Sequence, residues 1–370
     1  MRRLDFRTLA LGIAAPLLAL VIALAVGALV IVASGANPLT AVNTIAATAA
    51  RPRIQTQTIN TAITYYLSAV AVAIGFRMNL FNIGVDGQYR IAAMAAAAVG
   101  AAVALPPVLH QLTIIAVAVG VGAAWAGIAA VLKVTRGVSE VISTIMLNAI
   151  ATALVAWLIL PEQLGVREEG SNNVGTAVIA ASGRVASLPV VPGSVSGVYG
   201  LVVLAALVGV GYWFLLGFTR FGFDLRATGR SASAAVASGV SVKRMVVVSM
   251  LLSGATAGLV GMPQLLGDSY RYALDFPAGI GFTGIAVALL GRNHPVGMVF
   301  GALLWSFLER SSNGLQAQGI STEIVTIVQG IMVISVVVAY ELVRRYKLTL
   351  QQREVGRAVA VRADPAEVVG

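Results

Sequence analysis

The sequence contains no cysteine among its 370 residues, which excludes disulfides, thiolate metal sites and a cysteine nucleophile. Its two histidines, His110 and His294, lie far apart in expected turns, so we predict no metal centre and assign them no chemistry. Charge is also scarce: 11% of the residues are charged, 58% are hydrophobic, and the mean hydropathy is +0.89. This composition lies outside the range of soluble domains and predicts a membrane protein.

Apolar runs of about 20 residues recur along the chain, each long enough to cross a hydrocarbon layer of about 30 Å as a helix. They are longer than the roughly 10-residue strands of outer-membrane barrels. The first run exceeds the core of a signal peptide, so we expect it to be the first span. We therefore predict an all-α polytopic membrane protein with about ten transmembrane segments, including broken or short helices, in two related halves. The expected segments are residues 9–33, 58–76, 88–105, 111–132, 141–160, 199–218, 244–262, 279–291, 295–309 and 322–342.

The net charge of +10 could suggest nucleic acid, but the basic residues lie at the ends of the apolar runs. With the N-terminus inside, most of the 25 lysines and arginines fall in the expected inner segments, as the positive-inside rule requires. We predict a permease domain over residues 1–347, with an outer loop at 161–198 and an inner loop at 219–243, followed by a loose tail at 348–370. Within the inner loop, Ser231 to Ser238 could form a short helix that ends at Gly239.

Two glycine-interrupted segments, residues 75–87 and 277–284, lie in the two halves of the chain. Broken helices in corresponding halves often line the central substrate site of transporters. The alternative is that these glycines form tight turns or allow close helix packing.

The source of energy can also be predicted. None of the three lysines follows a glycine, so we expect no Walker-type phosphate loop and no bound cofactor. Ion-coupled carriers bury carboxylates at membrane depth, whereas here Asp86 is the one serious candidate of that kind. An ion-coupled carrier is thus disfavoured, and we expect a partner that docks on the inner loops to supply the energy.

Three motifs then carry a family resemblance. They are Phe-Asn-Ile-Gly-Val-Asp-Gly-Gln at 81–88, Gly-Val-Ser-Glu-Val-Ile-Ser-Thr-Ile-Met-Leu-Asn at 137–148, and Gly-Phe-Asp-Leu-Arg-Ala-Thr-Gly at 222–229, the last followed by Ala234-Ala235 and Gly239. From about residue 60 to 342 the chain resembles the permease subunits of bacterial ABC importers for branched-chain amino acids, simple sugars and nucleosides. The first two motifs are similar to the nucleoside branch.

The resemblance implies a transport subunit, not an enzyme, that translocates nucleosides into the cytoplasm and has no catalytic or metal-binding residues. Import of a simple, ribose-like sugar or of a branched-chain amino acid stays open, and an ion-coupled carrier is less favoured. The implied partners are cytoplasmic ATP-binding cassette subunits, a second and commonly homologous permease subunit, an extracytoplasmic substrate-binding lipoprotein and membrane lipid, with no nucleic acid. The implied location is the bacterial cytoplasmic membrane, with both termini in the cytoplasm.

The resemblance also implies that the loop from Phe221 to Val240 couples the chain to the ATPase. At Arg230-Ser231 the sequence departs from the Asn-Pro of the family pattern. The arginines of this loop could instead meet anionic lipid head groups or only fix the topology. The predicted coupling residues are Asp224, Arg226, Gly229, Arg230 and Gly239.

Six residues are candidates for the substrate pathway. Asn82, Asp86 and Gln88 could hydrogen-bond a ribose or a base, or could instead cap local backbone groups. Asn148 lies eight residues after Glu140 on the same helical face, and an amide at that depth must face protein or the pathway; Glu140 itself is better explained as an N-terminal helix charge. Phe282 and Thr283 could stack on and hydrogen-bond a base, or could simply pack.

Overall fold

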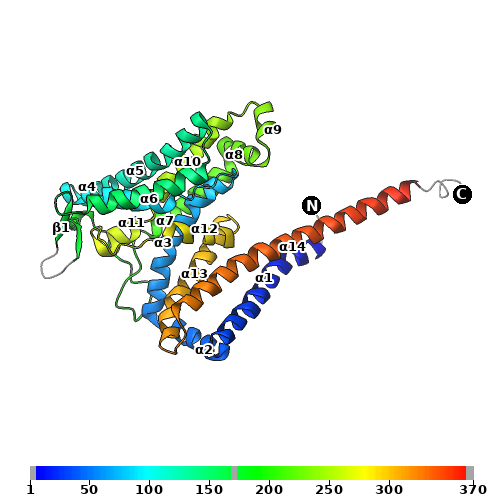
Figure 1. Cartoon of the computed structure of the whole chain (residues 1–370), viewed down its shortest axis with the longest axis horizontal. Coiled ribbons are helices and arrows are strands. Elements are labelled where there is room, and N and C mark those ends of the chain that lie inside the picture. The colour runs from blue at the N-terminus through cyan, green and yellow to red at the C-terminus, as the bar shows by residue number, and fades with distance from the viewer. Residues whose placement is uncertain (1–5, 168–172, 364–370) are drawn as a thin grey trace. The chain divides into compact units, whose positions relative to one another are not determined.

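The computed structural model describes residues 6–167 and 173–363 and divides the chain into two units. One unit is Ile45–Ser311, and the other is made of the chain on either side of it (Figure 1). The helices are α1 (Phe6–Ala33), α2 (Pro38–Ala49), α3 (Pro52–Phe76), α4 (Val85–Ala102), α5 (Pro107–Arg136), α6 (Glu140–Leu158), η1 (Ala181–Gly183), α7 (Val202–Phe218), α8 (Arg220–Arg230), α9 (Ala232–Ala237), α10 (Val242–Gly258), α11 (Met262–Gln264), η2 (Leu265–Ser269), α12 (Ile280–Leu290), α13 (Pro295–Gln316) and α14 (Thr322–Ala363).

Helix α3 is the central helix of the Ile45–Ser311 unit. It starts at Pro52, a residue suited to the first helical position because its missing N–H has no intrahelical partner there. From Ala62 to Gly75 every residue is buried, including the polar Thr64 and Ser68. A helix that is buried on all sides must be surrounded by other helices, and α7, α10 and α12 all pack against α3.

Helices α4, α5, α6 and α10 run alongside one another in the same unit (Figure 1). Helices α5 and α10 approach through glycine: a side chain at Gly122 would collide with the backbone of Gly254 and Gly258. Small residues permit such close backbone contact inside a membrane bundle. Helix α5 ends at Gly137, whose φ of +69° is the left-handed conformation typical of a helix C-terminus.

The loop at 161–198 contains the only strands of the described residues, β1 (Gly165–Arg167) and β2 (Val174–Thr176), which pair antiparallel. His110 holds this loop. It was predicted to lie in a turn, but it lies in the first turn of α5 and is fully buried. Its Nδ1 is 2.8 Å from the Ser182 hydroxyl, and its Nε2 is 2.9 Å from the Gly100 carbonyl oxygen. Helix α5 begins at Pro107, three residues before His110, and proline is well placed at a helix start.

The loop at 219–243 is more helical than predicted. The short helix near Ser231 is confirmed as α9, with the Ser231 hydroxyl accepting from Ala234 N at 3.3 Å and Gly239 following at a φ of +81°. Helix α8 was not predicted, because its sequence is polar and contains two glycines. It starts at a threonine cap, where Thr219 Oγ1 accepts from Gly222 N at 3.0 Å. The chain bends by 73° between α7 and α8.

The second unit contains α1 and α14, which pack along each other. Two features differ from the sequence predictions. No helix was predicted where α2 lies, and the tail after Lys347 was expected to be loose, whereas α14 continues to Ala363. Just before Lys347, Glu341 forms ion pairs within α14 with Arg344 at 2.8 Å and Arg345 at 2.9 Å, one helical turn away. Residues 364–370 of the predicted tail lie outside the described residues.

Five of the described helices are long and apolar enough to cross a membrane, and up to seven spans result if two bent helix pairs are each counted as one. The predicted class, an all-α polytopic membrane protein, is confirmed. The count of ten segments and the relation between two halves stay predictions, because α4 and α12 fall short of the length or hydropathy of a full span.

Candidate functional site

The two glycine-interrupted segments meet in the structure. Ser68, in the middle of α3, donates a hydrogen bond to the carbonyl oxygen of Ile280, the first residue of α12, at 3.0 Å. Asp86, in the first turn of α4, accepts one from Gly281 N at 3.2 Å. Both α4 and α12 therefore begin beside the middle of α3 and not at its end. In transporters, helices that start at membrane depth bring backbone groups and helix termini to the substrate pathway.

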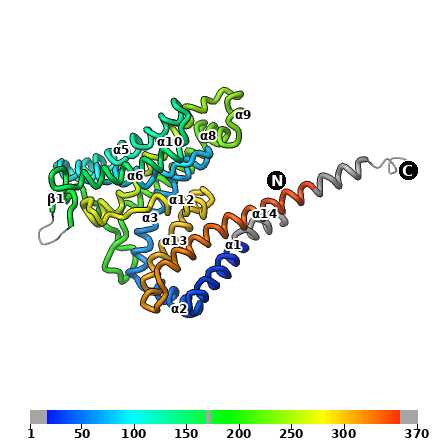
Figure 2. Tube along the Cα trace, viewed as in Figure 1, coloured from blue at the N-terminus to red at the C-terminus, as the bar shows by residue number. Residues whose placement is uncertain are grey.

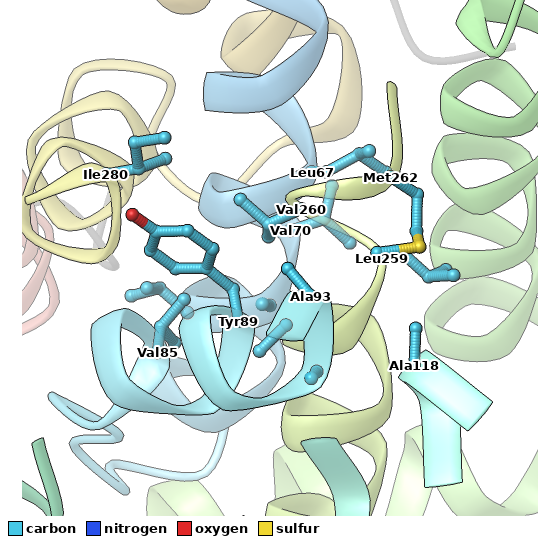
Figure 3. Packing of buried hydrophobic residues seen from close by; sticks show 14 of the residues in the cluster. Leu67, Val70, Val85, Tyr89, Ala93, Ala118, Leu259, Val260, Met262 and Ile280 are labelled. Atoms are coloured by element: carbon cyan, nitrogen blue, oxygen red, sulfur yellow. The ribbon is translucent and has the colours of Figure 1, made fainter. Parts of the chain in front are cut away.

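The contact between these helix starts leaves no space for side chains. A Cβ atom on Gly281 would collide with the backbone of Asp86, and one on Gly284 would collide with the Ser68 hydroxyl. Tyr89 closes the same contact by donating to the Pro277 carbonyl oxygen. Figure 3 shows the Tyr89 ring reaching toward the segment that carries Ile280. We refer to this meeting point of residues 82–89 with residues 277–284 as the helix junction.

Asp86 lies at the positive ends of two helices. It is in the first turn of α4, and it also accepts a hydrogen bond from the first turn of α12. A helix N-terminus carries a partial positive charge, so both helices stabilise this carboxylate. Asp86 is only 7% exposed. Its carboxylate is the charged group in the contact between α4 and α12.

Asn82 and Gln88 form a reciprocal amide pair within the α4 side of the helix junction. Asn82 donates to Gln88 Oε1 at 2.9 Å and to Ser253 Oγ at 2.8 Å, and its Oδ1 accepts from Gln88 Nε2 at 2.9 Å and from Gly84 N at 3.0 Å. Both side chains are almost fully buried. All four hydrogen-bonding positions of the Asn82 amide are thus occupied within the chain. Ser253 in turn donates to Ala71 O at 2.6 Å, which ties the pair to α3 and α10.

Helix α6 supports the beginning of α4 from one face. Asn148 Oδ1 accepts from Gly87 N at 2.8 Å, and Asn148 Nδ2 donates to Ile83 O at 2.9 Å. Glu140, the first residue of α6, pairs with Lys133 Nζ at 2.5 Å and accepts from Phe81 N at 3.5 Å. The two residues were predicted to share a face, and both contact the segment 81–87.

Phe282 and Thr283 lie in the first turn of α12. The Phe282 side chain is 53% exposed and Thr283 is half-buried. Of the six candidate pathway residues, Phe282 has the most accessible side chain. Its ring is available to a ligand, a partner chain or lipid, whereas Asn82 and Gln88 are enclosed.

A second acidic residue, not predicted from the sequence, lies beside the middle of α3, one of the candidate membrane spans. Glu309 was assigned to the end of an expected segment, but α13 continues to Gln316, and Glu309 accepts a hydrogen bond from the Tyr65 hydroxyl in the middle of α3. Asp86 is therefore not the only intramembrane candidate. The polar sequence after Glu309 had suggested that the helix ended there. Beside it, Arg310 Nε and Nη2 both donate to Thr61 Oγ1, at 3.0 and 2.5 Å. The signal in the sequence was the adjacent Glu309 and Arg310 at the end of an apolar run, because charged residues in such a place usually have polar partners on a neighbouring helix.

The predicted coupling residues lie on α8 and just after α9, beside the beginning of α10 (Figure 2). Helix α8 buries Leu225 and Thr228 against the rest of the unit and exposes Phe223 and Arg230. Asp224 and Arg226 are half-buried, Gly229 packs against the backbone of residue 77, and Gly239 is exposed. This end of the unit therefore presents an exposed, partly basic surface.

Close helix contacts through glycine, helices that start beside the middle of α3 and acidic residues beside that helix are typical of integral membrane transport proteins. The chain belongs to the family described as branched-chain amino acid transport system / permease component, whose model matches residues 54–337. It is a transport subunit and not an enzyme, and the resemblance read from its motifs is confirmed.

Several relatives are similar to this chain over nearly their whole length. The Bacillus subtilis guanosine ABC transporter permease protein NupP is 35% identical over 88% of this chain and 93% of its own. The Lactococcus lactis nucleoside ABC transporter permease protein NupB is 31% identical over 88% and 90%, respectively. The Haloferax volcanii glucose ABC transporter permease protein TsgB13 is 30% identical over 90% and 89%. No solved structure matches the chain.

Proposed function

We propose that this chain is the membrane-spanning permease of an ABC importer that carries nucleosides into the cytoplasm. The observation that carries the proposal is the 35% identity to a guanosine permease, which extends over 88% of this chain. The 31% identity to a nucleoside permease from a different bacterium supports the same substrate class.

The helix junction is the proposed substrate pathway. A nucleoside offers a flat base and a ribose with hydroxyl groups, so its site needs a ring to stack on and polar groups near it. Phe282 offers an exposed ring, and Thr283 offers a hydroxyl one residue further on. Asp86 would accept from ribose hydroxyls when α12 moves away from it. Asn148 would contact the ligand from α6, and Asn82 and Gln88 would hold the segment in shape until it opens.

Energy would come from cytoplasmic ATP-binding cassette subunits that dock on α8 and α9 through Asp224, Arg226, Gly229, Arg230 and Gly239. The exposed basic side chain of Arg230 and the exposed ring of Phe223 support docking at this surface. We further propose the bacterial cytoplasmic membrane as the location, with both termini in the cytoplasm. The complex would include a second, homologous permease subunit and an extracytoplasmic substrate-binding lipoprotein that meets the loop at 161–198.

A sugar is the second candidate substrate, because a glucose permease is 30% identical over a similar length. A ribose-like sugar and a nucleoside share hydroxyl groups, and they differ in the base. The Phe282 ring, which would have no base to stack on in a sugar permease, is the feature of the junction that favours a nucleoside.

The test is uptake of labelled guanosine, uridine, ribose, glucose and leucine by matched bacterial cells with and without the gene, before and after ATP depletion. We expect gene-dependent uptake of nucleosides that stops when ATP is depleted. If only the uptake of ribose, glucose or leucine depends on the gene, the proposed substrate class is wrong, but the ATP-driven mechanism stands. Uptake that survives ATP depletion and follows a proton or sodium gradient would refute the ABC assignment.

A further inference from the structure

The turn after α3 contacts α8 directly. Gly229 of α8 lies so close to this turn that a Cβ atom there would collide with the Arg77 carbonyl oxygen and lie 3.0 Å from Met78 Cα. Asn79 Nδ2 donates to the Gly229 carbonyl oxygen at 2.7 Å. Backbone meets backbone here, so a displacement of α8 reaches the turn without a flexible side chain between them.

The same turn also reaches the far end of α12. Arg77 Nη2 donates to the Asn293 carbonyl oxygen at 2.5 Å, and Arg77 Nε donates to the Tyr212 hydroxyl at 3.3 Å. Tyr212 itself donates to Asn293 O at 2.8 Å. Asn293 lies three residues after the end of α12, between α12 and α13. One turn therefore contacts α8, α7 and the residues that follow α12. We refer to α4 and α12, which both start within a glycine-interrupted segment, as the broken helices.

The turn is stiff. The backbone N–H groups of Met78 and Leu80 both donate to Gly75 O, at 2.9 and 3.0 Å. Asn79 has a φ of +56°, a left-handed conformation that asparagine tolerates better than most residues. The Met78 side chain is buried, with the Ser249 hydroxyl 3.6 Å from its sulfur. A closely packed turn whose backbone N–H groups are all hydrogen-bonded moves as one piece when it is pushed.

Beyond Leu80 the chain enters the helix junction. Phe81 N is held by Glu140, Asn82 lies in the amide network, and α4 begins at Val85 with Asp86 in contact with Gly281. The turn is thus connected to α4 along the chain and to the end of α12 through Arg77. Few residues separate α8 from either broken helix.

We propose that residues 77–80, here named the transmission turn, pass the movement of α8 to both broken helices during transport. Asn79 and Arg77 are its positioning residues: Asn79 holds the turn to α8, and Arg77 holds it to the end of α12. The inference rests on the proposed function, since α8 must be the element that the ATPase moves.

The experiment uses the complete transporter, reconstituted in proteoliposomes with its ATPase, and measures both ATP hydrolysis and nucleoside uptake. Asn79→Gly removes the hydrogen bond to Gly229 and keeps a residue suited to the positive φ, and Asn79→Ala adds strain. Asn313→Ala is the matched control, because Asn313 is also an exposed asparagine but belongs to the other unit of the chain. Mutations that disturb coupling between sites change it by an amount that corresponds to about two- to thirtyfold.

We expect Asn79→Gly to assemble with the ATPase and hydrolyse ATP at the normal rate, while uptake per ATP falls by about two- to thirtyfold. Asn79→Ala should lose at least as much, and Asn313→Ala should behave as wild type. Unchanged uptake per ATP in both Asn79 variants would overturn the proposal. So would an equal loss of hydrolysis and uptake, because that result is what a purely structural residue produces.

A second pair of substitutions separates this inference from the proposed function. Arg226→Glu combined with Arg230→Glu should prevent the ATPase from docking and abolish stimulated hydrolysis. If this double variant loses docking while Asn79→Gly retains full coupling, the docking surface stands and the transmission turn is refuted. If wild type shows no ATP-dependent uptake at all, the proposed function fails and the inference fails with it.

Discussion

Replacing Gly281 by alanine tests whether the contact between α4 and α12 is as close as the structure has it. The added methyl group would lie 2.7 Å from Asp86 Cα and 2.9 Å from Asp86 Cβ, and closer still to Asp86 N. These are mostly backbone atoms, which cannot rotate away as a flexible side chain can. Overpacking of this kind costs about 1–3 kcal/mol, so we expect the unfolding equilibrium to shift by about five- to 150-fold.

The matched control is Gly211→Ala in α7, where no atom lies within 4 Å of the new methyl group. Alanine favours a helix over glycine by up to about 1 kcal/mol, and this gain applies to both variants and cancels in the comparison. Denaturation of the purified protein in detergent measures stability, and uptake in cells measures function. We expect Gly281→Ala to be less stable than Gly211→Ala and to lose uptake. If the two variants prove equally stable and active, the close contact at the junction is refuted.

Three further outcomes follow from the same site. Asp86→Asn removes the charge between two helix N-termini. Since hydrogen bonds to charged groups are worth about 1.5–3 kcal/mol, we expect uptake to fall by about ten- to 150-fold yet to remain ATP-dependent. Residual uptake that collapses with an ion gradient would contradict this. Phe282→Ala should weaken nucleoside uptake by at least about fivefold, because stacking on one base is worth about 1–3 kcal/mol. The ability of a sugar to compete with the nucleoside should not change. If the binding of both ligands weakens equally in a competition assay, stacking on Phe282 is refuted. Glu140→Gln should lower the free energy of unfolding by about 1–2 kcal/mol. Exchanging Lys133 and Glu140 should restore this free energy only in part, because a lysine at position 140 cannot accept the hydrogen bond from Phe81 N. If denaturation shows the wild-type free energy in the exchanged variant, the hydrogen bond to Phe81 contributes nothing.

The proposed transmission turn and the helix junction assign different tasks to the two ends of the segment 77–89. Residues 77–80 contact α8 and the end of α12, and residues 82–89 contact the beginning of α12. A movement of α8 would therefore act on α12 at both of its ends. If this packing has a second stable arrangement, a small shift at one surface is turned into a larger opening elsewhere.

The intramembrane pair of Tyr65 and Glu309 shows how a polar group is accommodated inside the bundle. A carboxylate at membrane depth is costly unless it is hydrogen-bonded or paired, and here α13 presents Glu309 to a hydroxyl of the central helix. The neighbouring contact of Arg310 with Thr61 follows the same face of α3. Residues 306–310 of α13 thus direct polar groups toward α3, which supplies hydrogen-bond partners. If they faced lipid, these groups would have no partner.

The sequence by itself determined the class of the protein, an all-α polytopic membrane protein, because length and hydropathy decide whether a helix can replace water by lipid. Composition predicted a membrane protein without thiol chemistry, the positions of the lysines argued against a Walker-type loop, and the motifs at 81–88, 137–148 and 222–229 indicated the family. It also located the short helix before Gly239, since serine caps and left-handed glycines act locally. The predictions that were wrong also concerned local structure. Helix α8 and the last two turns of α13 were not predicted, because their sequences are polar.

Only the tertiary structure decided which of these segments meet. Asp86 and Gly281 are 195 residues apart, and Tyr65 and Glu309 are 244 apart, so no periodicity or motif links them. The structure also distinguished the enclosed Asn82 from the exposed Phe282, two residues that the sequence treated as equal candidates. Hydropathy reports how each helix interacts with its solvent, whereas contacts between distant helices depend on where glycines allow backbones to approach and where buried polar groups find partners.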